Sequence, residues 1–271
     1  MEIFVPSRSR PERSLTLECL APAVKHGRLW LVVPDKQAKA YAPLAKRHGV
    51  LVLPCPVDGI AATRQFIGKA AKDKFLMLDD DLRFYYRKSV DDWHLYPNTK
   101  RHDIAMLLMV ESLLDKYAHV CIGPRLFNAK YSSHVPPSGS KPNPEMYPMY
   151  EIGRPLRALA YRREPFNACE HGRVAIMEDF DVTLQLLRKG YKNVILTCYA
   201  QDQPQTQLPG GCSDYRTHTL HTVNVLKLKK LHNDFVTVVR KKNKTGGTFG
   251  TRIEASIKWE KAWNEAIGDI L

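Results

Sequence analysis

Short apolar runs alternate with longer amphipathic segments along the first third of the chain. Four runs are brief and apolar, and predict buried strands: 2–5, 29–33, 50–53 and 75–78. Three amphipathic segments between them predict helices: 11–24, 36–48 and 60–71. Pro43 predicts a break in the second of these helices. Strands that alternate with helices are typical of a parallel sheet with crossover helices, so we expect an α/β fold.

The rest of the chain follows the same pattern less regularly. Further strands are expected at 119–122, 157–163, 194–198 and 235–239. Further helices are expected at 104–117, 177–190, 215–231 and 252–267. Residues 131–155 are rich in Pro, Ser and Gly and predict a functional or disordered loop. Residues 240–247 are typical of a basic flexible segment.

Composition narrows the class of protein. The net charge of +13 favours a polyanionic partner such as nucleic acid, an anionic membrane surface or an acidic polymer. No apolar stretch is long enough to span a bilayer and no signal peptide is evident, so we expect a cytoplasmic protein with no membrane partner. The six cysteines show no CxxC spacing, which predicts free thiols and argues against a zinc knuckle or a redox dithiol.

Three consecutive carboxylates, Asp79-Asp80-Asp81, follow directly after the apolar run 75–78. Like charges at this spacing repel one another unless a cation lies among them. Mg²⁺ and Mn²⁺ take oxygen ligands, commonly one or two carboxylates together with substrate phosphates. In parallel sheets, ligands bind beyond the carboxyl ends of the strands, where this triplet lies. The alternative is a solvated acidic turn that caps the next helix.

Two other segments carry candidate chemistry. The loop Pro6–Arg10 follows the first strand and is expected at the same edge of the sheet as the acids. Glu178, Asp179 and Asp181 open the helix expected over 177–190, which ends at Gly190. Acids favour a helix N-terminus through the helix dipole, so capping alone would explain these three residues.

Taken in order, these motifs resemble a known family. Over residues 1–200, three motifs are similar to those of GT-A fold glycosyltransferases. They are Pro-Ser-x-x-Arg after the first strand, Leu-Asp-Asp-Asp, and Met-Glu-Asp-Phe-Asp…Leu-Leu-Arg-Lys-Gly-Tyr. The segments Ile3–Pro11 and Gly210–Thr217 resemble a narrower group, the bacteriophage glycosyltransferases associated with TET-type hydroxylases of DNA pyrimidines. The resemblance implies a Rossmann-like, mostly parallel sheet flanked by helices over 1–200. A helical and basic C-terminal extension, 201–271, would pack on it.

The resemblance also implies roles on the donor side. In the family, the acids after the fourth strand meet the donor and its metal. Asp81 is then the expected direct ligand of Mn²⁺ or Mg²⁺. Asp79 or Asp80 would meet the nucleotide ribose or a metal-bound water.

The first-strand loop and one arginine would hold the rest of the donor, UDP-glucose or a similar nucleotide sugar. Pro6 and Ser7 would line the base and ribose, and Arg8 would pair with ribose or phosphate. Arg64 matches the donor-site arginine of the family, and its guanidinium can meet a phosphate through two hydrogen bonds. The alternative for Arg64 is a salt bridge on the rim of the sheet.

On the acceptor side, the resemblance to inverting members makes Asp179 the expected general base, supported by Glu178. Many members complete the metal site with a late histidine. His218 is the first candidate, and His221 and His232 remain open as alternatives.

A DNA acceptor would account for the positive charge, and 5-hydroxymethylcytosine is the favoured target within it. The residues expected to contact DNA phosphates are Lys229, Lys230, Arg240, Lys241, Lys242 and Lys244. Three further positions of the phage-like segment, Gly210, Gly211 and Arg216, are counted with the expected site. The open alternatives are a glycosyltransferase of cell-surface glycans or lipid-linked sugars, and a non-catalytic DNA-binding protein on a transferase fold.

Overall fold

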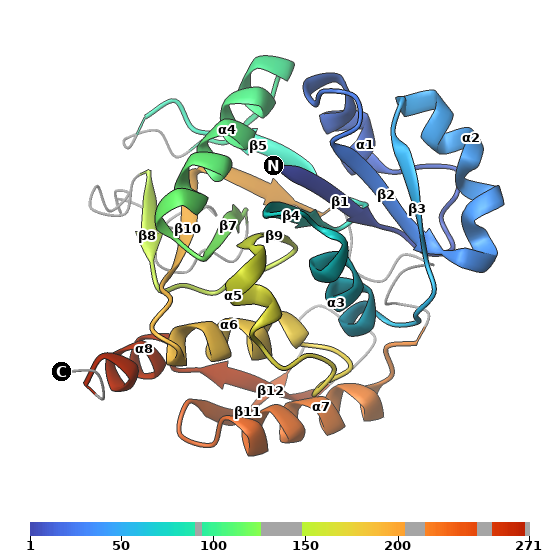
Figure 1. Cartoon of the computed structure of the whole chain (residues 1–271). Coiled ribbons are helices and arrows are strands. Elements are labelled where there is room, and N and C mark those ends of the chain that lie inside the picture. Colours follow the sequence, from blue (N-terminus) through green and yellow to red (C-terminus); the bar gives the residue numbers. More distant parts are fainter. Residues whose placement is uncertain (90–93, 126–147, 204–214, 243–250, 269–271) are drawn as a thin grey trace.

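The computed structural model describes residues 1–89, 94–125, 148–203, 215–242 and 251–268. In this part of the chain, a ten-stranded sheet forms the centre of the molecule, and a two-stranded sheet lies beside it. The order of the large sheet is β3-β2-β1-β4-β9-β7-β10-β5-β6, and β8 also pairs with β10. Figure 1 shows helices on both faces of the large sheet.

The main strands are β1 (Glu2–Pro6), β2 (Leu29–Pro34), β3 (Leu51–Cys55), β4 (Lys74–Leu78), β5 (Arg83–Tyr86), β6 (Tyr96–Pro97), β7 (His119–Pro124), β8 (Met149–Glu151), β9 (Ala158–Arg162) and β10 (Asn193–Asp202). The helices around them are α1 (Leu15–Leu20), α2 (Ala38–His48), α3 (Ile60–Ala70), α4 (Lys100–Lys116), α5 (Arg163–Asn167) and α6 (Glu178–Arg188), with short 3-10 turns at Ala21–Ala23 and Asp35–Gln37. The C-terminal elements are α7 (His218–Leu231), β11 (Val236–Lys242), β12 (Thr251–Ile257) and α8 (Trp259–Gly268).

The expected Rossmann-like, mostly parallel sheet flanked by helices is confirmed. Strands β3, β2, β1 and β4 are paired in parallel, and β7 pairs in parallel with β10. Strand β9 lies antiparallel between β4 and β7, so β7 runs in the same direction as β4. This insertion brings Arg157, which precedes β9, beside the end of β4, where the backbone N–H of Asp79 donates to the Arg157 carbonyl at 3.2 Å.

Both faces of the sheet are buried, which explains why its strands are continuous apolar runs. In β4, Leu76 and Leu78 pack with residues of α1, α2 and α4, whereas Phe75 and Met77 pack with residues of α3, α5 and α6. Each such side chain contributes about 1.5–3 kcal/mol when fully buried. The strand that carries the acidic triplet is therefore fixed from both sides.

Two N-terminal helices differ from the sequence-based expectation. Helix α2 continues through Pro43. The proline removes one intrahelical hydrogen bond, but the burial of Tyr41 and Leu44 holds the helix in place. Helix α1 begins only after Ser14, whose side chain caps it by accepting from the backbone N–H of Leu17 at 3.3 Å.

The prediction of a helix over 252–267 is wrong for the first half of this segment. Residues Thr251–Ile257 form β12, which pairs antiparallel with β11, and helix α8 begins at Trp259. Ile253, Ala255 and Ile257 alternate along the chain with polar residues, which is the period of a strand. Residues 240–242, expected in a flexible segment, are part of β11.

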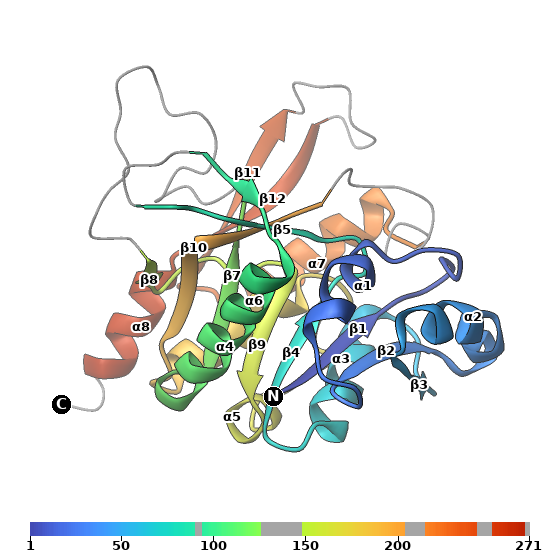
Figure 2. The same cartoon turned by 90° about the horizontal axis from the view of Figure 1, so that it is seen from above.

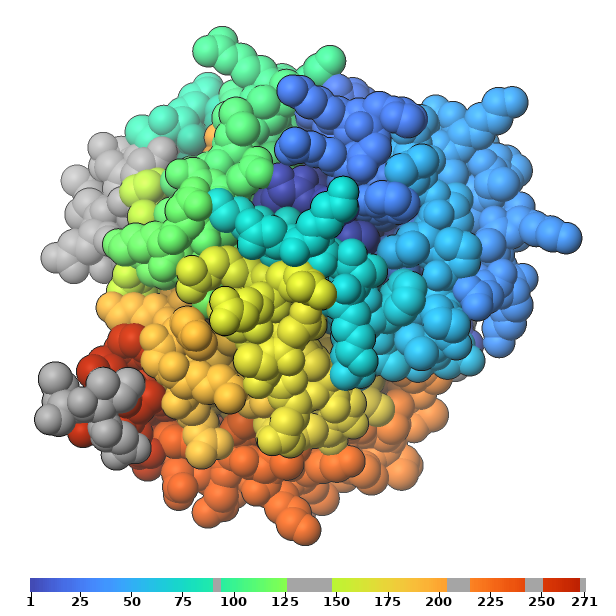
Figure 3. Space-filling view, in the orientation of Figure 1, coloured from blue at the N-terminus to red at the C-terminus, as the bar shows by residue number. Residues whose placement is uncertain are grey.

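The C-terminal elements pack on the outer side of α6. A third apolar cluster joins α6 to α7, β11 and α8 through Phe180, Leu184, Leu187, Leu228, Val236 and Ala262. Trp259 also packs edge-on against Phe180, with ring centroids 5.5 Å apart. In the space-filling view the orange C-terminal segment lies directly against the yellow segment that holds α5 (Figure 3). Strand β10 ends at Asp202, just past the expected boundary at residue 200.

A membrane-spanning helix would need both length and apolar character. Within the described residues, no helix has both. The five cysteines of these residues are free thiols, as the sequence predicts.

Gly68 marks the close approach of α3 to α5. A Cβ at this position would lie 2.2 Å from the ring of Phe166, which is itself buried against Phe75 and Tyr161. We expect Gly68→Ala to lower the free energy of unfolding by about 1–3 kcal/mol, because the ring has no room to move. Gly268→Ala is the control, since a Cβ there meets no atom within 4 Å. Urea unfolding of both variants measures the difference, and equal stabilities would contradict it.

Candidate active site

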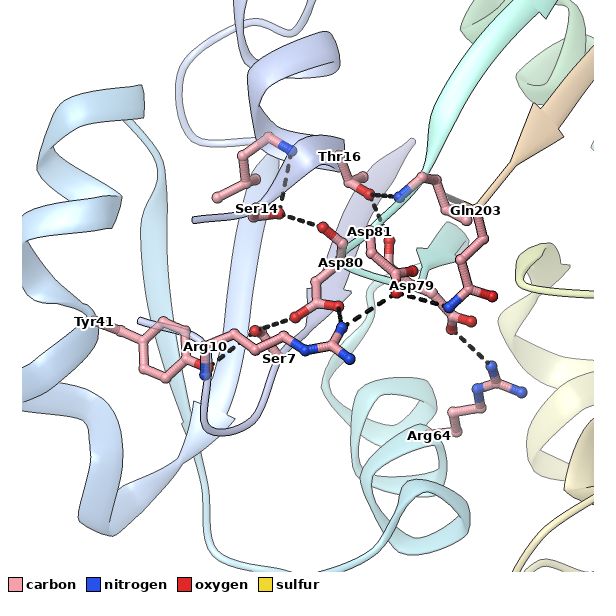
Figure 4. A network of polar contacts seen from close by, with 12 residues as sticks. Ser7, Arg10, Ser14, Thr16, Tyr41, Arg64, Asp79, Asp80, Asp81 and Gln203 are labelled. Carbon is pink, nitrogen blue, oxygen red and sulfur yellow. Dashed lines mark hydrogen bonds and ion pairs between the residues drawn. The ribbon is translucent and has the colours of Figure 1, made fainter. Parts of the chain in front are cut away.

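The site begins where β1 and β4 end side by side. The two strands are parallel neighbours, so the residues that follow them meet at the same edge of the sheet. The hydroxyl of Ser7, which follows β1, donates to the carboxylate of Asp80, and its oxygen lies 2.9 Å from the Tyr41 hydroxyl (Figure 4). Burial raises the pKa of Asp80 to about 6, although the Ser7 hydrogen bond and the charge of Arg10 oppose this. Ser7 and Asp80 thus form a buried polar contact at the expected donor edge.

The start of α1 holds the backbone of the acidic triplet. The Ser14 hydroxyl donates to the Asp80 carbonyl at 2.9 Å, and the Thr16 hydroxyl donates to the Asp79 carbonyl at 2.5 Å. Thr16 also accepts from the backbone N–H of Leu82 at 3.0 Å. The triplet is followed by strand β5 and not by a helix. The alternative of a solvated turn that caps a helix is therefore wrong.

Arg10 neutralises two of the three acids. Its Nη1 lies 2.9 Å from Asp80 Oδ1 and 3.2 Å from Asp81 Oδ2. Arg8, for which a contact with ribose or phosphate stays a prediction, pairs with the exposed carboxylate of Asp58 at 3.2 Å. Ser9 lies between the two arginines at a bend of the chain, with φ +57° in the left-handed region.

Arg64 joins the two acidic motifs. Its Nη2 lies 3.3 Å from Asp79 Oδ1, and its Nη1 donates to Glu178 Oε1. The side chain is 9 % exposed, so this is a buried ion-pair network and not a pair on an open rim. Although burial alone would lower it, the pKa of Arg64 is raised by the charges of Glu178 and Asp79. The structure thus brings Arg64 and both predicted acidic motifs together.

The second acidic motif, expected on the acceptor side, lies at the first turn of α6. Met177, the residue before the helix, adopts φ +67°, which is strained for a side chain of this kind. Asp179 accepts from the backbone N–H of Phe180 at 3.0 Å, and with Arg64 and Glu178 it lines a small cavity between α3 and α6. Burial raises the pKa of Glu178 to about 7 against the opposing charge of Arg64. Met177, the N-cap residue, makes no side-chain capping hydrogen bond to this helix.

The residues present fit a divalent cation. Arg10 and Arg64 contact acids of this group, and the charges of Arg157 and Arg154 act on Asp79 and Asp179. When all are ionised, the carboxylates outnumber these guanidiniums by one: Asp79, Asp80, Asp81, Glu178 and Asp179. Asp81 Oδ2 accepts from Gln203 Nε2 at 2.6 Å, whereas Asp81 Oδ1 is buried without a hydrogen-bond partner among the described residues. In the same part of the chain, no three acids, histidines or cysteines form a ready-made metal group. One or two carboxylates suffice for Mg²⁺ when substrate phosphates complete its shell.

Two of the three candidate histidines take part in other contacts. A ring nitrogen of His221 lies 3.0 Å from the Ile253 carbonyl, and His232 lies 2.7 Å from Asp181. His218 is exposed at the first position of α7. Within the described residues, none of the three joins the acidic triplet in a metal-binding group.

The predicted DNA-contacting residues lie on α7 and β11. Lys230, Arg240 and Lys241 are exposed, and Lys229 donates to the Asn233 carbonyl at 2.5 Å. Lys242 is the last residue of β11. Lys244, Gly210 and Gly211 lie outside the described residues. Arg216 is exposed, next to Tyr215, whose hydroxyl accepts from the first N–H of α3 at 3.2 Å.

Three residues of the site are missing from the sequence-based prediction. Arg10 is the arginine of the Pro-Ser-x-x-Arg motif, and this spacing was the available signal, although the prediction gave the role to Arg8. Gln203 follows β10, the strand beside β7, and its position beyond a strand end is the only available signal. Tyr41 belongs to α2, and only the packing of that helix brings its hydroxyl to Ser7 and to the backbone N–H of Arg10, at 2.9 Å each.

A comparison with known protein families identifies the family of this chain. A family model described as TET-Associated Glycosyltransferase matches residues 1–211. The chain belongs to this family. It is therefore a glycosyltransferase, and the alternative of a non-catalytic DNA-binding protein is wrong.

Individual relatives of this family member are distant. A beta-glucosyl-HMC-alpha-glucosyl-transferase of Enterobacteria phage T2 is 24% identical over 203 residues, which cover 70% of this chain and 68% of that protein. The enzyme of the same name from Enterobacteria phage T6 is 25% identical with the same coverage. A solved mannose-1-phosphate geranyltransferase from Thermus thermophilus matches 75% of this glycosyltransferase with 18% identity and a TM-score of 0.33. The chain spans 57% of that protein.

A buried cluster connects α6 of this glycosyltransferase to its C-terminal elements. Asp181, on α6, accepts from Arg173 Nε at 3.1 Å and contacts His232 at 2.7 Å. Its side chain is 2% exposed, and the Arg173 and His232 contacts lower its pKa against the effect of burial.

We expect Asp181→Ala to lower the free energy of unfolding by about 3–5 kcal/mol, because Arg173 and His232 would lose their buried partner. Glu170→Ala is the matched control, since Glu170 reaches the same Arg173 at 3.7 Å from a 77% exposed position. That change is expected to cost at most about 1 kcal/mol. Denaturant unfolding measures both, and equal losses would contradict the role assigned to Asp181.

Proposed function

We propose that this chain transfers a sugar from a nucleotide sugar, with UDP-glucose favoured, to the hydroxymethyl oxygen of 5-hydroxymethylcytosine in DNA. The observation that carries the proposal is the meeting of two acidic motifs at one buried guanidinium, that of Arg64. A transferase needs its donor and acceptor groups side by side, because the nucleophile must lie in line with the reacting carbon. Family membership and the phage relatives, named for glucosyl transfer involving HMC, support the same reaction.

In this proposal the donor lies across the ends of β1 and β4. Pro6 and Ser7 line the nucleoside, Arg64 pairs with the diphosphate, and Asp79 and Asp80 meet the ribose or a bound water. Asp81, assisted by Asp79, would hold Mn²⁺ or Mg²⁺, which supplies positive charge against the leaving diphosphate. The unpartnered Asp81 Oδ1 and the excess of carboxylates support this assignment.

The acceptor hydroxyl loses its proton to Asp179. The hydroxyl oxygen then forms a bond with the anomeric carbon of the sugar. The bond from that carbon to the nucleoside diphosphate breaks, and the diphosphate leaves with the electron pair. Glu178 holds Arg64 in place and so positions the base relative to the donor. A hydroxymethyl group inside a duplex is hard to reach, so the proposal includes flipping of the target base or a single-stranded substrate.

DNA would be held by the basic C-terminal elements. Strands β11 and β12 project from the body of the molecule (Figure 2). Arg240 and Lys241 are exposed on β11, and Lys230 is exposed on the adjacent α7. Exposed cations on a projecting element suit contacts with phosphates, which position nucleic acid without reading its sequence.

A second acceptor is favoured by one observation. The phage T2 and T6 relatives are named for transfer to beta-glucosyl-HMC, a base that already carries a sugar. The acceptor would then be a hydroxyl of that glucose, and the product a disaccharide on the base.

A transfer assay with two DNA acceptors tests the proposal. The protein is incubated with Mn²⁺, a pool of nucleotide sugars and DNA that carries either 5-hydroxymethylcytosine or its β-glucosylated form. Mass analysis of the nucleosides is expected to show one added hexose on one of the two acceptors. No adduct from any donor on either DNA would overturn the proposed acceptor class.

Substitution of the site acids tests the residue roles. Asp179→Asn is expected to lower kcat by about 10²–10⁴, the usual contribution of a general base. Asp81→Asn is expected to lower activity in a manner that added Mn²⁺ partly restores. Asp115→Asn is the control, because Asp115 pairs with Lys74 at the opposite end of β4 from the triplet. Full turnover by Asp179→Asn would remove the general base from Asp179.

The DNA contact is tested by salt dependence. The double variant Arg240→Gln/Lys241→Gln is expected to bind DNA more weakly. Each lost phosphate contact makes the negative slope of log K against log salt shallower by about 0.9. Lys39→Gln/Lys46→Gln removes the same charge from exposed positions on α2 and is expected to leave the slope unchanged. Equal slopes for the two double variants would refute a specific role of β11.

A further inference from the structure

All three acids of the triplet already have guanidinium partners. Asp79 contacts Arg64, whereas Asp80 and Asp81 share a single nitrogen of Arg10. Arg64 is deeply buried and also bound to Glu178, so it forms part of the framework. Arg10 differs, because its side chain is 19% exposed. The triplet is thus compensated by one fixed and one accessible arginine.

The loop that carries Arg10 is anchored independently of its guanidinium. The backbone N–H of Arg10 donates to the hydroxyl of the fully buried Tyr41 at 2.9 Å. Ser9, the preceding residue, is held by Gln37, which accepts from its backbone N–H at 2.9 Å. Because the backbone is fixed, the long side chain can change its position while the loop stays in place.

Arg10 and a divalent ion would compete for the same carboxylate. Asp81 Oδ2 accepts from both Arg10 and Gln203, while Asp81 Oδ1 is the buried oxygen without a partner among the described residues. An ion at Asp81 would bring two positive charges next to a guanidinium in a poorly solvated place, and like charges there repel strongly. The ion and the Arg10–Asp81 contact therefore oppose each other.

We propose that Arg10 is an exchangeable counter-cation of the donor site. It neutralises Asp80 and Asp81 before the metal binds, gives up Asp81 when the metal binds, and then presents its guanidinium to the donor diphosphate. This inference rests on the metal site of the proposed function. It assigns to Arg10 a role that the sequence suggested for Arg8.

Metal binding without any substrate tests the exchange. Mn²⁺ affinity is measured by electron paramagnetic resonance and titration calorimetry for the unmodified chain, Arg10→Gln and Arg8→Gln. Arg10→Gln is expected to bind Mn²⁺ at least about fivefold more tightly, the lower end of typical couplings between two sites. Arg8→Gln removes the same charge from the same loop, where its partner Asp58 is exposed, and is expected to change the affinity less than about twofold. Thermal unfolding of each variant verifies that it is folded.

The donor arm of the proposal has its own readout. With Mn²⁺ saturating, Arg10→Gln is expected to bind UDP more weakly than the unmodified chain, while Arg10→Lys, which keeps the charge, is intermediate in both Mn²⁺ and UDP affinity. Unchanged or weaker Mn²⁺ binding by Arg10→Gln would overturn the exchange, as would an absence of Mn²⁺ binding in every variant. Sugar transfer in the presence of a metal chelator would also overturn it while leaving the DNA acceptor of the proposed function intact. The two proposals therefore fail separately.

Discussion

The buried guanidinium of Arg64 is the contact on which the site depends. It binds Asp79 at the end of β4 and Glu178 at the start of α6, two residues that the chain separates widely. Removing one partner from a buried pair typically costs about 3–5 kcal/mol, because the remaining charge has no water to solvate it. That cost holds the acids after β4 and the acids at the start of α6 at a fixed separation.

The framework around Arg64 differs between the two halves of the site. On the donor side, α1 and the loop after β1 hold the triplet through Ser14, Thr16 and Ser7. On the acceptor side, α6 is packed between the sheet and the C-terminal elements, and Asp181 links it to His232 just beyond α7. The elements with the exposed basic residues thus share a buried contact with the helix that carries Asp179. DNA held there would lie against a part of the molecule that also positions the acceptor acids.

Much of the site was visible in the sequence because of strand topology. An apolar run of four residues followed by three acids predicts a strand and a ligand edge, and parallel pairing of β4 with β1 places Ser7 beside Asp80. The C-terminal prediction failed at 252–267, where alternation of apolar residues had to be distinguished from helical spacing. The alternation of Ile253, Ala255 and Ile257 is the local sign of a strand, and the pairing with β11 accounts for it.

The sequence by itself determined the α/β class, the sheet edge that carries the acids, and the two acidic motifs, since these follow from local periodicity and the order of elements. Only the tertiary structure decided which arginine reaches which acid. Arg8 and Arg10 lie two residues apart in the same loop, and the fold, with the loop anchored on Tyr41, places Arg10 and not Arg8 at Asp80 and Asp81. Charge pairing acts over a few ångströms in space, and the sequence does not contain those distances.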